Sequence, residues 1–146
     1  MELRAAVEPS LARIAAERAS NARIAEIEAA LRDMEASVDS LEAFIPHDLA
    51  FHEHIARASD NEFLGALSNV VRDSVLTTMI VLQVPERIRK SRLGLHRAVY
   101  EAIATRDGDR AMSAMRLLVD EANRDIENVL KHSQGRRKAD DAEAGL

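Results

Sequence analysis

Apolar residues recur along most of the chain at intervals of three and four, the spacing of a helix that buries one face. Six stretches with this period follow one another, at residues 3–14, 24–38, 41–55, 64–82, 96–103 and 111–129. Residues that favour helix starts stand before four of these stretches, namely Ser20, Ser40, Asn61 and Asp107. Val84-Pro85 marks the end of the fourth stretch. The pattern predicts an all-α fold of about six helices.

The composition agrees with one helical domain and narrows the classes of function. A chain of 146 residues with 47% hydrophobic residues can bury a substantial core, and only five glycines and three prolines interrupt it. Because there is no cysteine, disulfides and thiolate metal sites are excluded. The net charge of −5 makes this chain by itself a poor candidate for binding the phosphate backbone of a nucleic acid.

Nothing in the sequence indicates a membrane protein. No apolar run approaches the roughly 20 residues that span a bilayer. The first residues, Met1-Glu2-Leu3-Arg4, lack the basic and then apolar layout of a signal peptide. We therefore expect no membrane association and a cytoplasmic location.

Two polar segments are predicted to lie outside the helices. The basic segment that contains Arg87, Arg89, Lys90 and Arg92 could suggest nucleic-acid binding. Because the chain as a whole has a negative net charge, the segment is instead expected to form a solvated loop between helices. From residue 133 the chain loses its apolar period, so residues 1–132 are predicted to form the domain and residues 133–146 a disordered tail.

The central helical stretch carries polar residues where its period requires apolar ones. Asp48 and His52 stand four residues apart in the apolar stripe, so both point to the same inward face. His96 interrupts the stripe of the fifth stretch in the same way. A carboxylate and two imidazoles suit Zn, Ni, Fe or Mn, and three ligands leave positions for water or an anion. The alternative is that these residues are buried and hydrogen-bonded to one another without a metal.

Known catalytic motifs do not fit these residues. His47-Asp48 lacks the upstream histidine of the HD phosphohydrolases, and His52-Glu53-His54 lacks the spacing of a zincin. The paired Glu-x-x-His motifs of di-iron bundles and a glycine-rich phosphate loop are also absent from the sequence. We therefore expect that the chain is not an enzyme.

Four segments in order resemble the FCD domain, the C-terminal ligand-sensing domain of FadR-type GntR transcription regulators. The opening ELRAAVEP at residues 2–9, followed by AAERA at 15–19, looks like the first helix of that domain. DLAFH at 48–52, followed by IARASDN at 55–61, is similar to its D-x-x-F-H segment and the small-residue-N motif that follows. HRAVYEAI at 96–103 and DGDRA at 107–111 match its H-R segment and its G-D turn. The resemblance covers residues 2 to about 130.

The resemblance implies an antiparallel helical bundle whose cavity binds a small organic acid, often beside a divalent metal held by one Asp and three His. The matching residues here are Asp48, His52 and His96. The fourth ligand is expected in MRLLV at residues 115–119, where Leu118 stands in place of the histidine. The metal site is therefore expected to be weakened, with water or the effector completing it, or else the cavity is metal-free.

Two arginines are candidates for binding the effector. Arg4 matches the arginine of the family's opening motif, which looks into the cavity, and a guanidinium pairs a carboxylate in bidentate fashion. Arg72, beside the apolar Val71, is a weaker candidate. For Arg4 the alternative is a surface arginine in a salt bridge, and for Arg72 it is a solvated side chain.

The resulting expectation is an effector-sensing domain that also forms a homodimer, through an apolar face to which Leu64, Leu67 and Val71 contribute. DNA would be bound only by a winged helix-turn-helix domain that this chain does not contain, so the chain is either an excised sensor or a stand-alone domain. Effector binding would shift the bundle between two shapes and so change the spacing of the DNA-binding heads. The competing hypothesis is a structural dimerisation module with a dry core and no ligand.

Overall fold

The computed structural model describes the backbone of residues 2–144, but not the side chains of residues 81, 129, 130 and 132–144. Within that range the chain forms six helices and no strand, which confirms the all-α prediction. The helices are α1 (Glu2–Arg18), α2 (Asn21–Ser37), α3 (Leu41–Arg57), α4 (Glu62–Leu82), α5 (Glu86–Ala104) and α6 (Gly108–Ala144).

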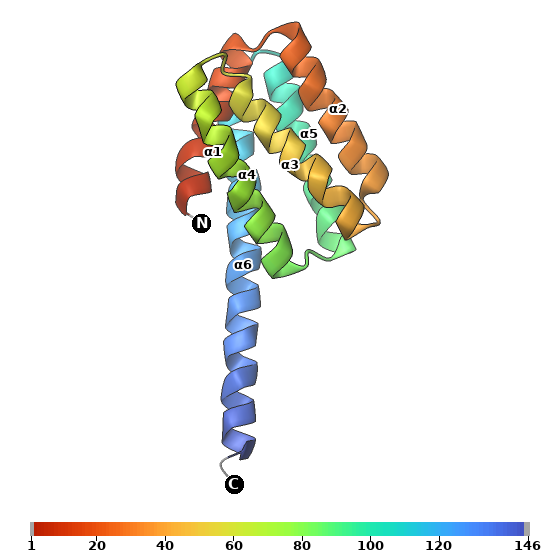
Figure 1. Cartoon of the computed structure of the whole chain (residues 1–146), viewed down its shortest axis with the longest axis vertical. Coiled ribbons are helices and arrows are strands. Elements are labelled where there is room, and N and C mark those ends of the chain that lie inside the picture. The colour runs from red at the N-terminus through yellow and green to blue at the C-terminus, as the bar shows by residue number, and fades with distance from the viewer. Residues whose placement is uncertain (1, 145–146) are drawn as a thin grey trace.

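The helices pack as a bundle in which the first and the last helix lie side by side (Figure 1). The first helix, α1, packs along α6, while α3 lies between α2 and α4, and α5 contacts α6 and α2. The core is built mainly of small and medium apolar side chains, with Phe51, Ile27, Leu31, Met34 and Met115 among the largest that are fully buried.

All four predicted helix starts are confirmed by capping hydrogen bonds, including Asp107, whose side chain accepts from the Arg110 backbone N–H at 3.0 Å before α6. Ser20 accepts from the Arg23 backbone N–H at 3.2 Å, and Ser40 accepts from that of Ala43 at 3.3 Å. The Asn61 side chain accepts from the backbone N–H groups of two following residues at 2.9 and 3.2 Å, as expected of a cap. Each bond satisfies a donor that the first helical turn leaves unpaired.

The basic segment at residues 87–92 is helical, so its prediction as a solvated loop was wrong. The helix α5 begins at Glu86, directly after Pro85, and both Arg89 and Arg92 are buried. Arg89 donates to the carbonyls of Val38 and Val84, and another residue, Asp125, accepts from Arg92. These partners allow two guanidinium groups to enter the interior.

The predicted dimer face of α4 is only partly free. Val71 is 2% exposed and belongs to the core of its own chain, so it cannot contribute to a contact with a second copy. The large apolar side chains that α4 does expose are Phe63, Val70 and Ile80. Homodimerisation itself stays a prediction.

The last helix continues past the boundary expected at residue 132. Its backbone is helical to Ala144 and extends away from the bundle (Figure 1). The residues there include Lys, Arg, Ala and Glu, which favour helix without tertiary support, although the sequence alone predicted a disordered tail. The last two residues of that tail, 145–146, lie outside the described residues. No helix in the described part of the chain is long and apolar enough to cross a membrane.

Candidate functional site

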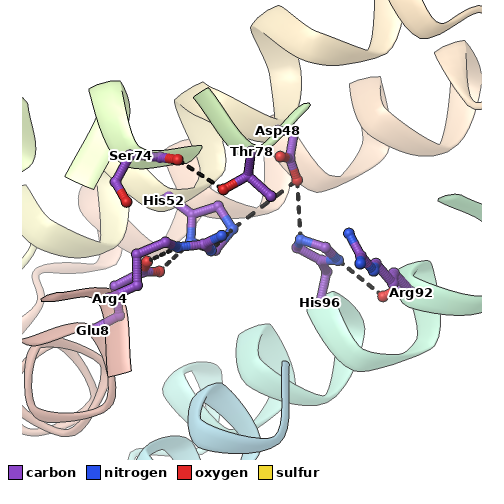
Figure 2. A network of polar contacts seen from close by, with 8 residues as sticks. All are labelled: Arg4, Glu8, Asp48, His52, Ser74, Thr78, Arg92 and His96. Carbon is purple, nitrogen blue, oxygen red and sulfur yellow. Dashed lines mark hydrogen bonds and ion pairs between the residues drawn. The ribbon is translucent and has the colours of Figure 1, made fainter. Parts of the chain in front are cut away.

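The structure brings Asp48, His52 and His96 together in the interior of the bundle (Figure 2). All three residues are at most 5% exposed, and one potential ligand atom from each lies within 4.8 Å of the others. The first two stand one turn apart on α3, and the third faces them from α5. Phe51 packs edge-on against both imidazole rings, at centroid distances of 5.7 and 5.1 Å, which restricts their orientation.

The tautomer of His96 is set by the backbone of its own helix. Its Nδ1 lies 2.8 Å from the carbonyl oxygen of Arg92, and because a carbonyl only accepts, Nδ1 must carry the proton. The other nitrogen, Nε2, lies 3.1 Å from Asp48 Oδ1. It is nevertheless among three buried polar side-chain atoms of the described chain that have no partner in hydrogen-bonding geometry. In a neutral ring this nitrogen presents a lone pair to a carboxylate, an arrangement that a cation between them would stabilise.

The tautomer of His52 is set by a residue that the sequence analysis missed. Its Nδ1 lies 2.5 Å from Oε2 of Glu8, which comes from α1 and is 2% exposed. A proton shared in this contact leaves His52 Nε2 to face the site, 4.0 Å from Asp48 Oδ1. A carboxylate behind a metal-binding histidine is a common way to orient the ring and raise its basicity. Both imidazoles therefore have Nδ1 engaged outside the site and Nε2 directed into it, although His52 Nε2 also has the Arg4 guanidinium 3.5 Å away.

Arg4 completes the network on the α1 side. Its Nε donates to Glu8, and its terminal nitrogen NH2 lies 3.5 Å from His52 Nε2 (Figure 2). The residue is 3% exposed. The structure therefore places Arg4 at the cavity rather than on the surface, and its binding of an effector stays a prediction. Arg72 is exposed on α4, and the structure does not bring it to this site.

Both buried carboxyl groups are held in the ionised form. Burial raises the pKa of Glu8, but the charges of His52 and Arg4 and their hydrogen bonds outweigh this effect and bring the pKa to about 2. Burial also raises the pKa of Asp48, and the contact with His96 and the charges of His52 and Arg4 lower it to about 2. At neutral pH the site therefore offers a full negative charge on Asp48.

A small cavity lies between these residues and the neighbouring helices. Its walls are Arg4, Phe44, Asp48, His52, Val75, Thr78, Met79, Val84, Arg89, Arg92, His96, Leu118 and Ala122. The space in which the centre of a water-sized molecule fits is about 20 Å³. That is room for a water or an ion but not for an organic acid.

Comparison with known proteins places this arrangement in a family. The family model described as the FCD domain matches residues 1–121. The chain belongs to the FCD domain family. This confirms the resemblance seen in its sequence motifs.

Among curated relatives, the galactonate operon transcriptional repressor of Escherichia coli K12 is 33% identical over 131 residues, which are 88% of this chain and 56% of the relative. The HTH-type transcriptional regulator LutR of Bacillus subtilis 168 is 32% identical over 120 residues, covering 79% of this chain and 55% of the relative. The chain thus spans about half the length of these proteins. Both are named as transcription regulators and neither as an enzyme, in agreement with the expectation that this domain is not an enzyme.

A solved structure supports the fold. The domain superposes on the Streptococcus agalactiae GntR with a TM-score of 0.70, over 84% of this chain and 56% of that one. The sequence identity is 23%, so this likeness shows a shared FCD fold and no more.

The residues of this FCD domain fit a divalent metal with three protein ligands. Nitrogen and oxygen ligands bound at about 2.0–2.2 Å stand roughly 3–4 Å from one another, and the two spacings measured from Asp48 Oδ1 are 3.1 and 4.0 Å. Leu118 is 2% exposed and lines the same cavity, at the position where the family's fourth ligand was expected. It offers no donor atom, so the site has one ligand fewer than the family pattern.

Glu8→Gln is expected to lower the affinity for Zn²⁺ by about 10- to 100-fold, because a neutral amide accepts more weakly from His52 Nδ1 and no longer raises the basicity of the ring. The matched control is Glu17→Gln, which removes the carboxylate of the exposed Arg13–Glu17 pair on the same helix. Competition titration with a chromophoric chelator measures both affinities. Equal Zn²⁺ affinities in the two variants would show that Glu8 does not support the metal site.

Proposed function

We propose that the chain is the effector-sensing and dimerisation domain of a longer GntR/FadR-type transcription regulator. Its effector is a small organic acid, bound beside a divalent metal ion that Asp48, His52 and His96 hold. The observation that carries this proposal is the convergence of three ligand atoms within 4.8 Å, with the second nitrogen of each imidazole already engaged elsewhere. A structural core has no need for two imidazoles that direct Nε2 toward one carboxylate, least of all when Nε2 of His96 has no hydrogen-bond partner among the described residues.

The donor set favours Zn, Ni, Fe or Mn over Mg or Ca, because imidazole suits the former and oxygen ligands the latter. When bound, such an ion would act as a Lewis acid toward the carboxylate of the effector and offset its charge. Leu118 adds no ligand, so water or the effector fills the remaining positions. The three-ligand site is correspondingly weaker than a four-ligand one.

Arg4 is proposed to bind the effector beside the metal. It lies at the cavity with one terminal nitrogen near His52, and a guanidinium pairs well with a carboxylate. Its interaction with Glu8 fixes its position before the effector arrives. The second arginine from the sequence analysis, Arg72, is exposed and serves better as a control.

Signal transmission follows from the size of the cavity. Since about 20 Å³ of free space cannot hold an organic acid, the side chains or the helices around the cavity have to move apart when the effector binds. A domain that is closed without effector and wider with it has the two states that a population shift requires. We propose that a homodimer of such domains changes the spacing of two winged helix-turn-helix heads on DNA, in the cytoplasm.

An organic-acid screen tests the proposal. The Zn²⁺-loaded chain and the chelator-treated chain are each titrated with a panel of organic acids while the melting temperature is measured. A true effector is expected to stabilise the loaded chain by about 2.7 kcal/mol at one hundred times its dissociation constant. The chelated chain should respond much less.

The two arginine variants locate the effector in the same experiment. Arg4→Gln should lose most of the stabilisation, whereas Arg72→Gln should respond as the parent does. Equal responses from both variants would place the effector elsewhere. If no acid stabilises the loaded parent, the closed cavity favours the other hypothesis, a structural dimerisation module.

A further inference from the structure

The inner face of α5 buries two arginines and a histidine in a row. Arg89, Arg92 and His96 recur at the spacing of one helix face, and they are 5%, 8% and 3% exposed. Arginine is rarely buried to this extent without a reason. Together with Arg4, these residues give the cavity three guanidinium groups, whereas Asp48 is the one acidic residue among its lining side chains.

The partners of Arg4 and Arg89 already hold them in place. Arg4 is paired with Glu8, which lies behind the cavity wall. Arg89 donates through Nε to the Val38 carbonyl at 2.8 Å and through a terminal nitrogen to the Val84 carbonyl at 2.5 Å. These carbonyls lie at the ends of α2 and α4, so Arg89 ties two helix ends together and has a clear structural role.

Arg92 differs because it is incompletely satisfied. One terminal nitrogen pairs with Asp125 of α6, whose side chain is 27% exposed. Its Nε is buried and has no hydrogen-bond partner among the described residues. A buried cation with an unused donor is costly to keep, unless a ligand uses it. An anion in the cavity would supply the acceptor that Arg92 lacks.

Charge adds a second argument. The three arginines of the lining are balanced by Asp48 and by the paired carboxylates of Glu8 and Asp125 when both histidines are neutral, so a divalent ion leaves an excess of two positive charges. A monocarboxylate would neutralise only half of this excess inside a low-dielectric interior. An effector with two acidic groups matches it better.

We infer that Arg92 forms a second anion-binding subsite of the cavity and that the effector is a small diacid. One carboxylate binds at the metal and Arg4, and the other binds Arg92. This inference rests on the proposed function, because it assumes that an acid enters this cavity.

Asp125 then competes with the effector for Arg92. Arg92 lines both the cavity and a surface groove between α5 and α6, where Asp125 and Glu121 also lie. When the second carboxylate of the effector takes Arg92, Asp125 is released toward solvent, where water can solvate it. Removal of the negative charge of Asp125 should therefore favour binding of a diacid.

The test compares acids that differ only in the number of carboxylates. Isothermal titration measures the binding of malonate, succinate, glutarate and adipate to the Zn²⁺-loaded chain, against propionate, butyrate, valerate and hexanoate. At least one diacid is expected to bind about tenfold more tightly than the monoacid of equal length. Arg92→Gln should abolish that preference, because it should weaken the binding of the diacid much more than that of the monoacid.

Two further variants separate recognition from folding. Arg97→Gln is the matched control, because Arg97 lies on the same helix but is half exposed and paired with Glu35. Asp125→Asn should bind the preferred diacid several-fold more tightly than the parent, which a merely damaged fold would not do. Circular dichroism verifies that each variant is folded.

The outcomes distinguish a failure of the Arg92 subsite from a failure of the proposed function. If monoacids bind and no diacid binds more tightly, the inference about Arg92 is wrong and the proposed function stands. An equal loss of both kinds of acid in Arg92→Gln would also overturn the subsite. If neither kind binds the loaded parent, the proposed function and the inference fail together.

Discussion

His52→Ala and His96→Ala are each expected to lower the affinity of the domain for Zn²⁺ by at least about 100-fold, or roughly 3 kcal/mol. Each change removes one of three ligands from a site that already lacks the family's fourth. Two remaining ligands cannot hold a divalent ion in competition with water. Each variant also loses an imidazole that lies near the buried Asp48 carboxylate, so the metal-free protein should become less stable as well.

Two other histidines on the same helix serve as controls. His47 and His54 are both partly buried on α3, but each lies 3.8 Å from a carboxylate outside the cavity, Asp33 and Glu26 respectively. His47→Ala and His54→Ala should therefore bind Zn²⁺ as the parent does. Chelator competition provides the affinities, and metal analysis of dialysed protein provides the occupancy. Parent-like binding by both His52→Ala and His96→Ala would show that the ligands were misassigned.

Much of the fold was readable from the sequence because helix periodicity and capping are local. Ser20, Ser40 and Asn61 start helices where they were expected to, since a cap acts within three residues of itself. The start of α5 was misplaced, because a run of arginines looks solvated when its acceptors are unknown. Those acceptors, such as Val38 and Asp125, come from helices far away in the sequence.

The sequence predicted those residues of the candidate site that interrupt the apolar stripe of their own helix. Asp48 and His52 were visible as polar residues in an apolar stripe, and His96 repeated the anomaly. Glu8 was missed because the apolar period of the first stretch, residues 3–14, was taken to run through Leu3 and Val7, which would place Glu8 outside the buried face. The buried face instead runs through Arg4 and Glu8 and continues along alanines, namely Ala12, Ala15 and Ala16.

A signal for that face does exist in the sequence. Alanines at helical spacing permit close packing against another helix, and here α1 packs along α6. The line from Ala15 back through Ala12 leads to Glu8 and then to Arg4 at intervals of three or four residues. What no local pattern supplies is the pairing of Glu8 with His52, which are 44 residues apart and meet only because α1 and α3 pack together.

Leu118→His is expected to destabilise the metal-free domain and to tighten its binding of Zn²⁺. Without metal, a new imidazole would replace a side chain that is 2% exposed, and an unsatisfied polar group there costs about 1–3 kcal/mol. With Zn²⁺ the same imidazole completes the ligand set, so the affinity should rise about tenfold or more. The variant should therefore melt below the parent in chelator and gain more than the parent when Zn²⁺ is added.

The neighbouring residue makes this test specific. Leu117 is 46% exposed, so it points away from the buried cavity that Leu118 lines. Leu117→His introduces the same imidazole on the same turn of α6 and should change neither the melting temperature in chelator nor the Zn²⁺ affinity appreciably. If Leu118→His gains no affinity over Leu117→His, position 118 does not face the metal ligands closely enough to join them. A gain confined to Leu118→His would show that the domain retains the geometry of a four-ligand site and lacks only the fourth donor atom.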